Sequence, residues 1–252
     1  MRFPRSLLAL SAAFALFAFQ GPVLAQDKDA FTSAQKQQLE SLVRDILVKN
    51  PKILVEAMQA LEEQQQAQRD QAAKQMIKQQ AKAIFDDGVS YVAGNPKGDV
   101  TLVEFFDYRC GYCKQVQPSV LALLQEDPKL RVVLKELPVL GPESVVAARA
   151  AIAALQQPGN KYLAYHNAMM AFRGKLDEAQ VLRMAKEAGL DTDKLKTDMA
   201  SARTGGIIDG NLKLAEALGI EGTPGFVIGD TLVPGAVSAD SLRMLVRKAR
   251  GG

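Results

Sequence analysis

Residues 101–113 read TLVEFFDYRCGYC and contain both cysteines of the 252-residue chain, Cys110 and Cys113. The first six of these residues are rich in β-branched and aromatic side chains, which predicts a central strand. Beyond the cysteines, apolar residues return at positions 116, 120, 123 and 124, a spacing that predicts a helix. The two cysteines therefore stand where a strand passes into a helix.

This junction suits thiol chemistry better than a structural disulfide. A bond between residues three apart would close a very small loop and remove little entropy from the unfolded chain. At the start of a helix, free N–H groups and the helix dipole favour a thiolate on Cys110, and Arg109 and Lys114 act in the same direction. We expect Cys110 to be the attacking thiolate and Cys113 the resolving thiol. Two alternatives stay open: inert thiols, or a Cu(I) site, because two thiolates suit this soft ion.

The rest of the C-terminal part predicts an α/β domain. The order of elements is β, β, α, β, several α, β, β, α, so a helical insertion separates two groups of strands. No internal repeat is evident. The further strands are expected at 90–92, 130–137, 226–228 and 231–233, the helical insertion within 142–219, and an amphipathic helix at 239–250.

Residues 1–25 predict a cleaved secretory signal peptide. Arg2 and Arg5 form a basic start, residues 7–19 are apolar except for one serine, and Val23-Leu24-Ala25 is a small-residue cleavage site. The alternative, a membrane anchor, needs about 20 apolar residues, more than this stretch has. No later segment is long and apolar enough to span a bilayer, so we expect an exported, periplasmic protein without a membrane span.

Residues 26–88 predict a helical region that associates with other copies of the chain. Apolar residues recur at helical spacing from Leu39 to Leu47 and from Ile53 to Leu61. Asn50-Pro51 marks the start of a second helix, expected over 51–85 with Asn50 as its N-cap. Nine of the ten residues 62–71 are polar, and such a stretch has no core to lie against. Two helices make a poor core alone, which favours self-association; folding back onto the following domain is the alternative.

Charge and composition exclude several other functions. The formal net charge is +3, and removal of the two arginines of the signal peptide leaves 29 basic against 28 acidic residues. This balance lacks the excess of positive charge that is typical of nucleic-acid-binding proteins. Two cysteines and one histidine exclude a multi-ligand zinc centre within one chain and a disulfide scaffold. His166 has no catalytic neighbours in the sequence, and we expect it in packing or on the surface. We expect four methionines at helical spacing to fill the core: Met169, Met170, Met184 and Met199.

Residues 89–252 resemble a thioredoxin-fold domain of the DsbA type, with a helical insertion at about 142–203. The features that carry the resemblance are Glu104-Phe105-Phe106, Cys110-Gly111-Tyr112-Cys113 and Thr223-Pro224. The resemblance implies a redox-active disulfide between the two cysteines and a cis Pro224 opposite the pair. It implies a client peptide bound on the backbone of Thr223, with Gly111 and Tyr112 beside it. It also implies that Glu104, buried under the pair, helps move protons; we expect Lys135, on the neighbouring strand, to be its partner.

Within this superfamily the chain is most similar to the ScsC branch, which is associated with suppression of copper sensitivity and carries an N-terminal oligomerisation region. Gly111-Tyr112 lacks the histidine of the strongly oxidising members, and Thr223 replaces their common valine, as in the isomerases. The resemblance implies a disulfide isomerase or reductase that acts on misoxidised client proteins. It further implies a homotrimer and a membrane redox partner that keeps the cysteines reduced. A dithiol oxidase and a Cu(I)-binding protein for copper tolerance are the alternatives, and no other cofactor is implied.

Overall fold

The computed structural model describes residues 31–251 of the chain. The predicted signal peptide, residues 1–25, lies outside the described residues and stays a prediction. The described chain divides into two compact units, of which the first ends at Ala60 and the second begins at Leu61. The division falls inside one long helix, so this helix contributes to both units.

The first unit consists of α1 (Ser33–Lys49) and the start of α2 (Lys52–Gln79). Thr32 begins α1 with a capping box, in which its hydroxyl accepts from the Gln35 N–H and the Gln35 side chain accepts from the Thr32 N–H. The prediction that Asn50 caps the second helix is wrong. Its side-chain amide donates to the carbonyl oxygen of Ile46 at 3.0 Å and closes α1 instead.

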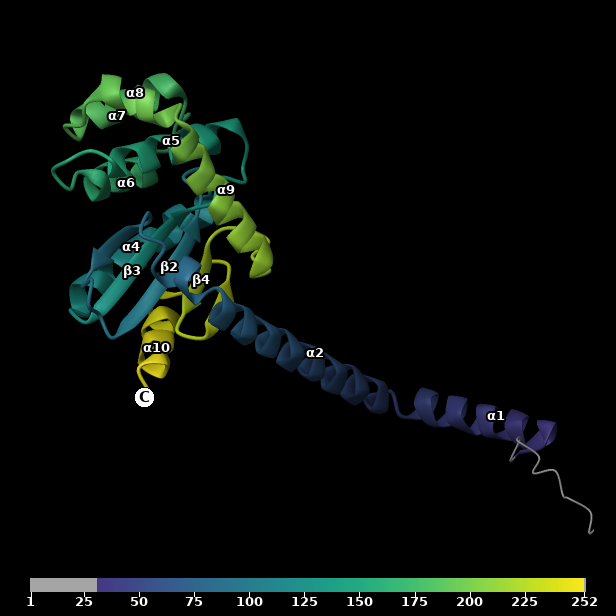
Figure 1. The fold of residues 1–252 in the computed structure, drawn as a ribbon. Coiled ribbons are helices and arrows are strands. Elements are labelled where there is room, and N and C mark those ends of the chain that lie inside the picture. Colours follow the sequence, from purple (N-terminus) through teal and green to yellow (C-terminus); the bar gives the residue numbers. More distant parts are fainter. Residues whose placement is uncertain (1–30, 252) are drawn as a thin grey trace, which may run out of the picture. The chain divides into compact units, whose positions relative to one another are not determined.

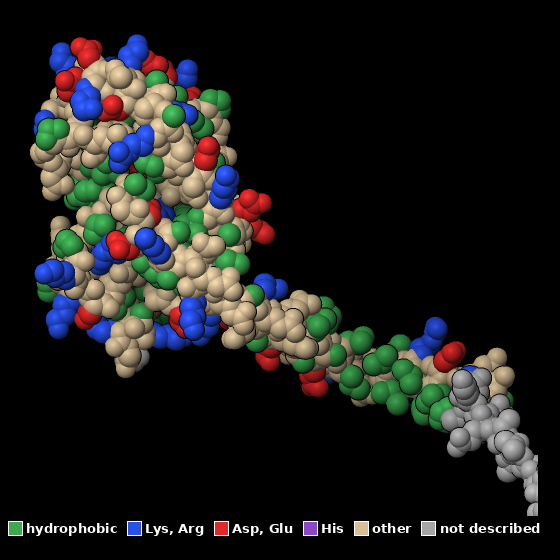
Figure 2. Space-filling model, viewed as in Figure 1, with side chains coloured by type: hydrophobic (Ala, Val, Ile, Leu, Met, Phe, Trp, Pro, Cys, Tyr) green, Lys and Arg blue, Asp and Glu red, His purple; other side chains and the backbone are tan. Residues whose placement is uncertain are grey.

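The apolar stripes of the first unit find no cover within that unit. No residue of α1 is buried, and Leu42, Ile46 and Met58 are 57%, 42% and 62% exposed. Figure 2 shows hydrophobic side chains gathered along α1 and the start of α2. Apolar surface left in water costs about 25 cal/mol per Å². Burial of these apolar side chains therefore requires a surface that the first unit does not supply.

The second unit is built on a five-stranded mixed sheet in the order β1-β3-β2-β4-β5. β2 and β3 run parallel, and the other neighbouring pairs are antiparallel. All five strands are predicted from the sequence, with ends that differ by two residues at most. Their bounds are β1 (Tyr91–Gly94), β2 (Val100–Phe106), β3 (Leu130–Glu136), β4 (Gly225–Ile228) and β5 (Thr231–Pro234).

One face of the sheet is covered by α4 (Gly111–Glu126) and α10 (Ala239–Ala249) (Figure 1). The predicted helical insertion lies between β3 and β4, and it shares the core of this face through buried residues such as Tyr162 and Met169. The insertion consists of α5 (Pro142–Leu155), α6 (Tyr162–Ala171), α7 (Glu178–Glu187), α8 (Thr192–Met199) and α9 (Ala202–Ala217).

The opposite face is covered by the end of α2, by α3 (Ala81–Phe85) and by α9. Ile77 and Ile84 are buried in this second core together with Phe105. The sequence predicts an unbroken helix over 51–85, but the structure interrupts it at Gln80, and both isoleucines reach this core. These residues therefore serve the second unit, although they lie in the predicted N-terminal region 26–88. Within residues 31–251, no helix is both long and apolar enough to cross a membrane.

Candidate active site

Cys110 is the N-cap residue of α4, at the point where β2 has ended and the helix begins. Its sulfur accepts a hydrogen bond from the backbone N–H of Cys113, over 3.4 Å between sulfur and nitrogen. The Cys110 side chain is 5% exposed, whereas the neighbouring Gly111 and Tyr112 are open to solvent. The sulfur therefore lies at the N-terminal end of the α4 dipole, where negative charge is favoured.

Cys113 has very different surroundings, inside the first turn of α4. It is fully buried, and burial raises the pKa of its thiol far above the usual range. Such a thiol does not attack a disulfide until a base takes its proton. This asymmetry fits the roles that the sequence predicts, with Cys110 attacking and Cys113 resolving. Both cysteines are present as free thiols.

The loop before β4 brings Thr223 and Pro224 to the cysteines from a distant part of the sequence. The Thr223–Pro224 peptide bond is cis, as predicted. The Cys110 thiol donates a hydrogen bond to the backbone carbonyl oxygen of Thr223, over 3.1 Å. The carbonyl oxygen of Pro224 in turn accepts from the N–H of Gly235 at 2.9 Å, which ties this loop to the end of β5. The structure thus places the predicted client-binding backbone against the sulfur of Cys110.

Glu104 lies on β2, on the face of the sheet that α4 covers. Its side chain is buried, and neither carboxyl oxygen has a hydrogen-bond partner. Burial raises the pKa of Glu104 to about 8, so the carboxyl group is mostly neutral at pH 7. Its negative charge, when formed, adds to the effect of burial in raising the pKa of Cys113. A second buried carboxyl, Glu136, accepts a hydrogen bond from the hydroxyl of Tyr162 at 2.7 Å.

The predicted pairing of Lys135 with Glu104 is wrong. In the register of β2 and β3, Glu104 lies opposite Leu134, whereas Lys135 lies opposite Phe105. Successive side chains of a strand point to opposite faces, so Lys135 and Glu104 are on different sides of the sheet. Lys135 instead donates from its buried amine to Asp87, 2.5 Å away, in the segment before β1.

Asp107 positions the loop around the cysteines, a role that is not among those predicted from the sequence. The residue is buried, and its backbone carbonyl oxygen accepts from the Cys110 N–H at 3.0 Å. One carboxylate oxygen accepts from the N–H of Arg109, and the other accepts from the N–H groups of Val139 and Leu140. An aspartate that directly follows a buried strand is a signal that could have identified it, because such a carboxylate commonly accepts from nearby backbone N–H groups.

The surface beside the helix start is positively charged. Arg109 forms an ion pair with Glu143, and the Lys114 amine donates to the carbonyl oxygen of Phe172. Burial, followed by repulsion from Arg173 and Arg109, lowers the pKa of Lys114. Both cations that the sequence singled out are therefore near the cysteines, and Arg173, from the loop after α6, joins them in the same cleft.

His166 is a core residue. Its ring nitrogens lie 2.9 Å from the Tyr108 hydroxyl and 3.2 Å from the Gln117 amide nitrogen, and burial lowers its pKa to about 3, so it is neutral at pH 7. The four methionines expected in the core are buried there. Among residues 31–251, no group of three or more His, Cys, Asp or Glu side chains could hold a metal ion. A Cu(I) ion at this site would rely on the two cysteine thiolates.

Two known families match the chain. Residues 101–247 match the family described as the DSBA-like thioredoxin domain, a match that covers more than half of the chain. Residues 35–68, which include most of α1 and the first part of α2, match the family described as the copper resistance protein ScsC N-terminal domain.

Curated relatives include proteins of two kinds. The chain is 31% identical over 166 residues to the Na⁺/H⁺ antiporter NhaA 3 of Salinispora tropica, and this match covers 65% of the chain but only 25% of the antiporter. It is 27% identical over 146 residues to the thiol:disulfide interchange protein DsbA of Bordetella pertussis, covering 56% of the chain and 69% of DsbA. The chain thus spans a quarter of the length of the first relative.

Similar solved structures include thioredoxin-like proteins and ScsC. A thioredoxin-like oxidoreductase from Silicibacter pomeroyi is 47% identical, with a TM-score of 0.65 over 68% of this chain and 98% of that one. A linker-deletion variant of ScsC from Proteus mirabilis is 31% identical, with a TM-score of 0.64 over 89% and 99%. A periplasmic thioredoxin-like protein from Salmonella enterica is 32% identical, with a TM-score of 0.62 over 68% and 96%.

Proposed function

The chain belongs to the family of DsbA-like thiol:disulfide oxidoreductases, and we propose that it is an exported disulfide isomerase that works from a reduced Cys110. The observation that carries the proposal is the contact of the Cys110 sulfur with the Thr223 carbonyl oxygen. This contact places the attacking sulfur atom next to the backbone on which a client peptide would lie. The features that favour isomerisation over oxidation are the threonine at position 223 and a Gly111-Tyr112 dipeptide without histidine.

The proposed reaction begins when the Cys110 thiolate attacks one sulfur of a wrong disulfide in a client. The client's disulfide breaks, a mixed disulfide with Cys110 forms, and the other client sulfur leaves as a thiolate. Attack on the mixed disulfide by a different client thiolate then forms a new client disulfide and returns Cys110 as a thiolate. Electrons are conserved, so isomerisation itself needs no oxidant or reductant.

When no client thiol attacks the mixed disulfide, Cys113 and Glu104 can release the client from Cys110. The ionised Glu104 carboxylate accepts the proton of Cys113, and the resulting thiolate attacks Cys110. This step releases a reduced client and leaves a Cys110–Cys113 disulfide. Two electrons are then required to restore the dithiol, which is why the proposal includes a membrane-bound reductase as partner.

The first unit supports the proposal through association. Exposed apolar stripes on α1 and α2, together with the match to the ScsC N-terminal family, favour a homo-oligomer, and we propose a trimer. Several reduced sites around one client would raise the effective concentration for a second attack. The polar residues 62–71 would link the association region to each catalytic unit.

The redox state of the cysteines separates this function from its two alternatives. The test measures the reduction potential of the Cys110/Cys113 couple in redox buffers and traps the state of the pair in the compartment where the native protein resides. We expect a pair that is held reduced there and reacts with misoxidised clients. A pair held oxidised, with a potential near the value of about −120 mV typical of a strong oxidase, would favour a dithiol oxidase. A reduced pair that binds Cu(I) stoichiometrically and has no activity on clients would favour a copper carrier.

Export is tested in cells that produce the native protein. We propose cleavage after Ala25 and a periplasmic location, which the periplasmic relative from Salmonella enterica supports. Fractionation followed by N-terminal sequencing of the mature protein is expected to give Gln26 as the first residue. A protein that keeps its first residues in the cytoplasmic fraction would contradict the proposed location.

A further inference from the structure

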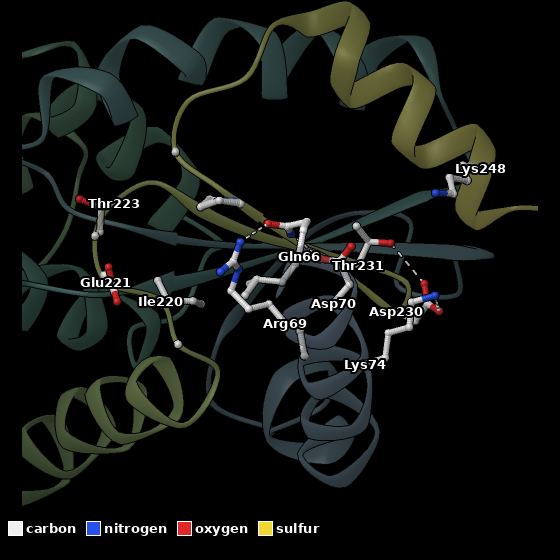
Figure 3. Close-up of a pocket in the computed structure, with 16 residues that line it drawn as sticks. Gln66, Arg69, Asp70, Lys74, Ile220, Glu221, Thr223, Asp230, Thr231 and Lys248 are labelled. Carbon is white, nitrogen blue, oxygen red and sulfur yellow. Dashed lines mark hydrogen bonds and ion pairs between the residues drawn. The ribbon is translucent and has the colours of Figure 1, made fainter. Parts of the chain in front are cut away.

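A pocket lies beside the redox site, between α2 and the loop that carries Thr223 (Figure 3). One wall is the part of α2 within residues 66–74, and the opposite walls are residues 219–223, the β4–β5 turn and β5. From the sequence, the polar residues 62–71 of α2 are expected to have no core to lie against. In the structure, Gln66, Arg69, Asp70 and Lys74 line the pocket instead.

The pocket shares one residue, Thr223, with the site of disulfide exchange. Figure 3 shows Thr223 at one end of the pocket, Lys248 at the other and Arg69 between them. The carbonyl oxygen of Thr223 is the atom that contacts the Cys110 sulfur. A chain that is joined to Cys110 and extends past Thr223 in this direction therefore enters the pocket.

The lining matches the chemistry of an extended peptide. On the helix side, Gln66 donates to Asp70 at 2.7 Å, and Arg69 donates to Gln66 at 2.9 Å, so amide, guanidinium and carboxylate groups form one hydrogen-bonded row. Peptide backbone needs donors and acceptors together, which this row supplies. Ile220 and Leu232 add apolar surface for client side chains.

The charge balance also favours a peptide over a small ion. The lining contains three cations and three carboxylates, so it selects neither an anion nor a cation. Lys74 and Asp230 lie 3.0 Å apart and join α2 to the β4–β5 turn at the end away from Thr223. Among residues 31–251, β5 is an edge strand of the sheet, and an edge strand can pair with a further extended segment.

We propose that this pocket binds the extended client segment next to the cysteine that is joined to Cys110. The segment of α2 within residues 66–74 is then part of the client-binding surface as well as the connection to the first unit. This inference rests on the proposed function for the identity of the client, but the binding itself requires only a mixed disulfide with Cys110.

A trapped mixed disulfide tests the proposal directly. The full chain with Cys113→Ala is reacted with a short peptide that carries one activated cysteine disulfide; the Cys110 thiolate attacks, and the activating thiolate leaves. Two peptides are compared, with a photoreactive residue three positions before or after the cysteine, a reach of about 10 Å in extended chain. We expect one of the two peptides to crosslink to residues 66–74 or 230–235. The chain with Cys110→Ala and Cys113→Ala is the control and is expected to give no crosslink.

The outcomes separate the inference from the proposed function. Crosslinks from both peptides that fall only outside the pocket would overturn the inference, whatever the isomerase activity of the chain. A second test replaces Gln66 and Arg69 with alanine and compares this variant with Gln65→Ala/Gln68→Ala, two positions that do not line the pocket. We expect KM for a scrambled protein client to rise about fivefold only in the first variant, with the rate on glutathione disulfide changed less than about twofold. An equal KM in both variants would contradict the assignment.

Discussion

Glu104 carries a buried carboxyl group with both oxygens unpartnered, on the strand that leads to the cysteines. Such a group costs much free energy as a charge and far less as a neutral acid. With its pKa raised to about 8, it exchanges a proton near neutral pH, at the position where Cys113 needs a base. Proton transfer with Cys113 gives this otherwise unfavourable residue a function.

Glu104→Gln removes the base and keeps the shape of the side chain. We expect the first attack by Cys110 to be unchanged and the release of the mixed disulfide by Cys113 to slow about 100-fold, the scale of general base catalysis. Quenched-flow trapping of the mixed disulfide measures both steps. Glu187→Gln, at an exposed site on α7, is the matched control. An unchanged lifetime of the mixed disulfide in Glu104→Gln would remove Glu104 from the mechanism.

The same substitution is expected to change how stability depends on pH. Because the pKa of Glu104 is about 8 in the folded chain and near 4.5 when unfolded, the folded state holds the proton over this window and the unfolded state releases it. The free energy of unfolding therefore falls as pH rises from about 4.5 to 8. Urea unfolding of the reduced proteins at pH 5 and pH 8 is expected to show a smaller fall in Glu104→Gln, by roughly 2 to 4 kcal/mol. Equal falls would mean that Glu104 is ionised in the folded protein.

At the scale of elements, the register of β2 and β3 decides which charged groups meet. It places Glu104 on the face of the sheet that α4 covers and Lys135 on the other face, where Lys135 donates to Asp87. Asp87 also accepts from the backbone N–H groups of Val89 and Ser90, so one side chain both shapes the entry to β1 and pairs a buried lysine. Burial alone would raise the pKa of Asp87, but the hydrogen bonds from Lys135 and Ser90 outweigh it and lower the pKa.

Asp87→Asn tests the importance of this buried pair. The substitution leaves the Lys135 amine fully buried without a counter-charge, which costs about 3 kcal/mol of stability. The depressed pKa of Asp87 gives the wild type a contribution that is present above the unfolded value near 3.8 and is lost as pH falls through the folded value. We therefore expect the loss in urea unfolding to be large at pH 7 and smaller near pH 3. A loss that is the same at both pH values would show that the charge of Asp87 is not its cause.

The sequence predicts the elements well because their signals are local. The run of β-branched and aromatic residues at 101–106 and the helical spacing after Cys113 are visible without any partner. The sequence wrongly suggests Glu104 as the partner of Lys135, because it predicts that the two strands are neighbours but does not predict their register. From the sequence, Ile77 and Ile84 belong to the N-terminal region, because nothing local indicates that they are buried in the same core as Phe105. The role of Asp107 depends likewise on Val139 and Leu140, which are distant in sequence.

At the scale of the whole molecule, α2 contributes to both units. Its first residues carry an apolar stripe in the unit that ends at Ala60, and its later residues line a pocket and bury Ile77 in the second unit. A chain cut at Ser90 would lose Ile77, Ile84 and Asp87 and leave Lys135 unpaired. Substitutions in the full chain are therefore a better test of association than truncation at that point.

Leu42→Lys/Ile46→Lys places two charges on the apolar stripe of α1. We expect light scattering to give a trimer for the wild type and a monomer for this variant, because a buried apolar interface does not tolerate unpaired charges. The monomer is expected to keep its rate on glutathione disulfide within about twofold, because the second unit is unchanged. Gln37→Lys/Ser41→Lys, on α1 but outside the stripe, is the control and is expected to stay oligomeric. A monomeric wild type would refute association through this stripe.

The central claim is that a reduced Cys110 rearranges wrong disulfides. It is tested by adding the reduced full chain to a scrambled, fully oxidised client enzyme and following the return of client activity. We expect recovery well above the buffer rate for the wild type, about tenfold less for Leu42→Lys/Ile46→Lys because avidity is lost, and none for Cys110→Ala. The claim is contradicted if the wild type recovers no more activity than buffer while its disulfide form readily oxidises a reduced client.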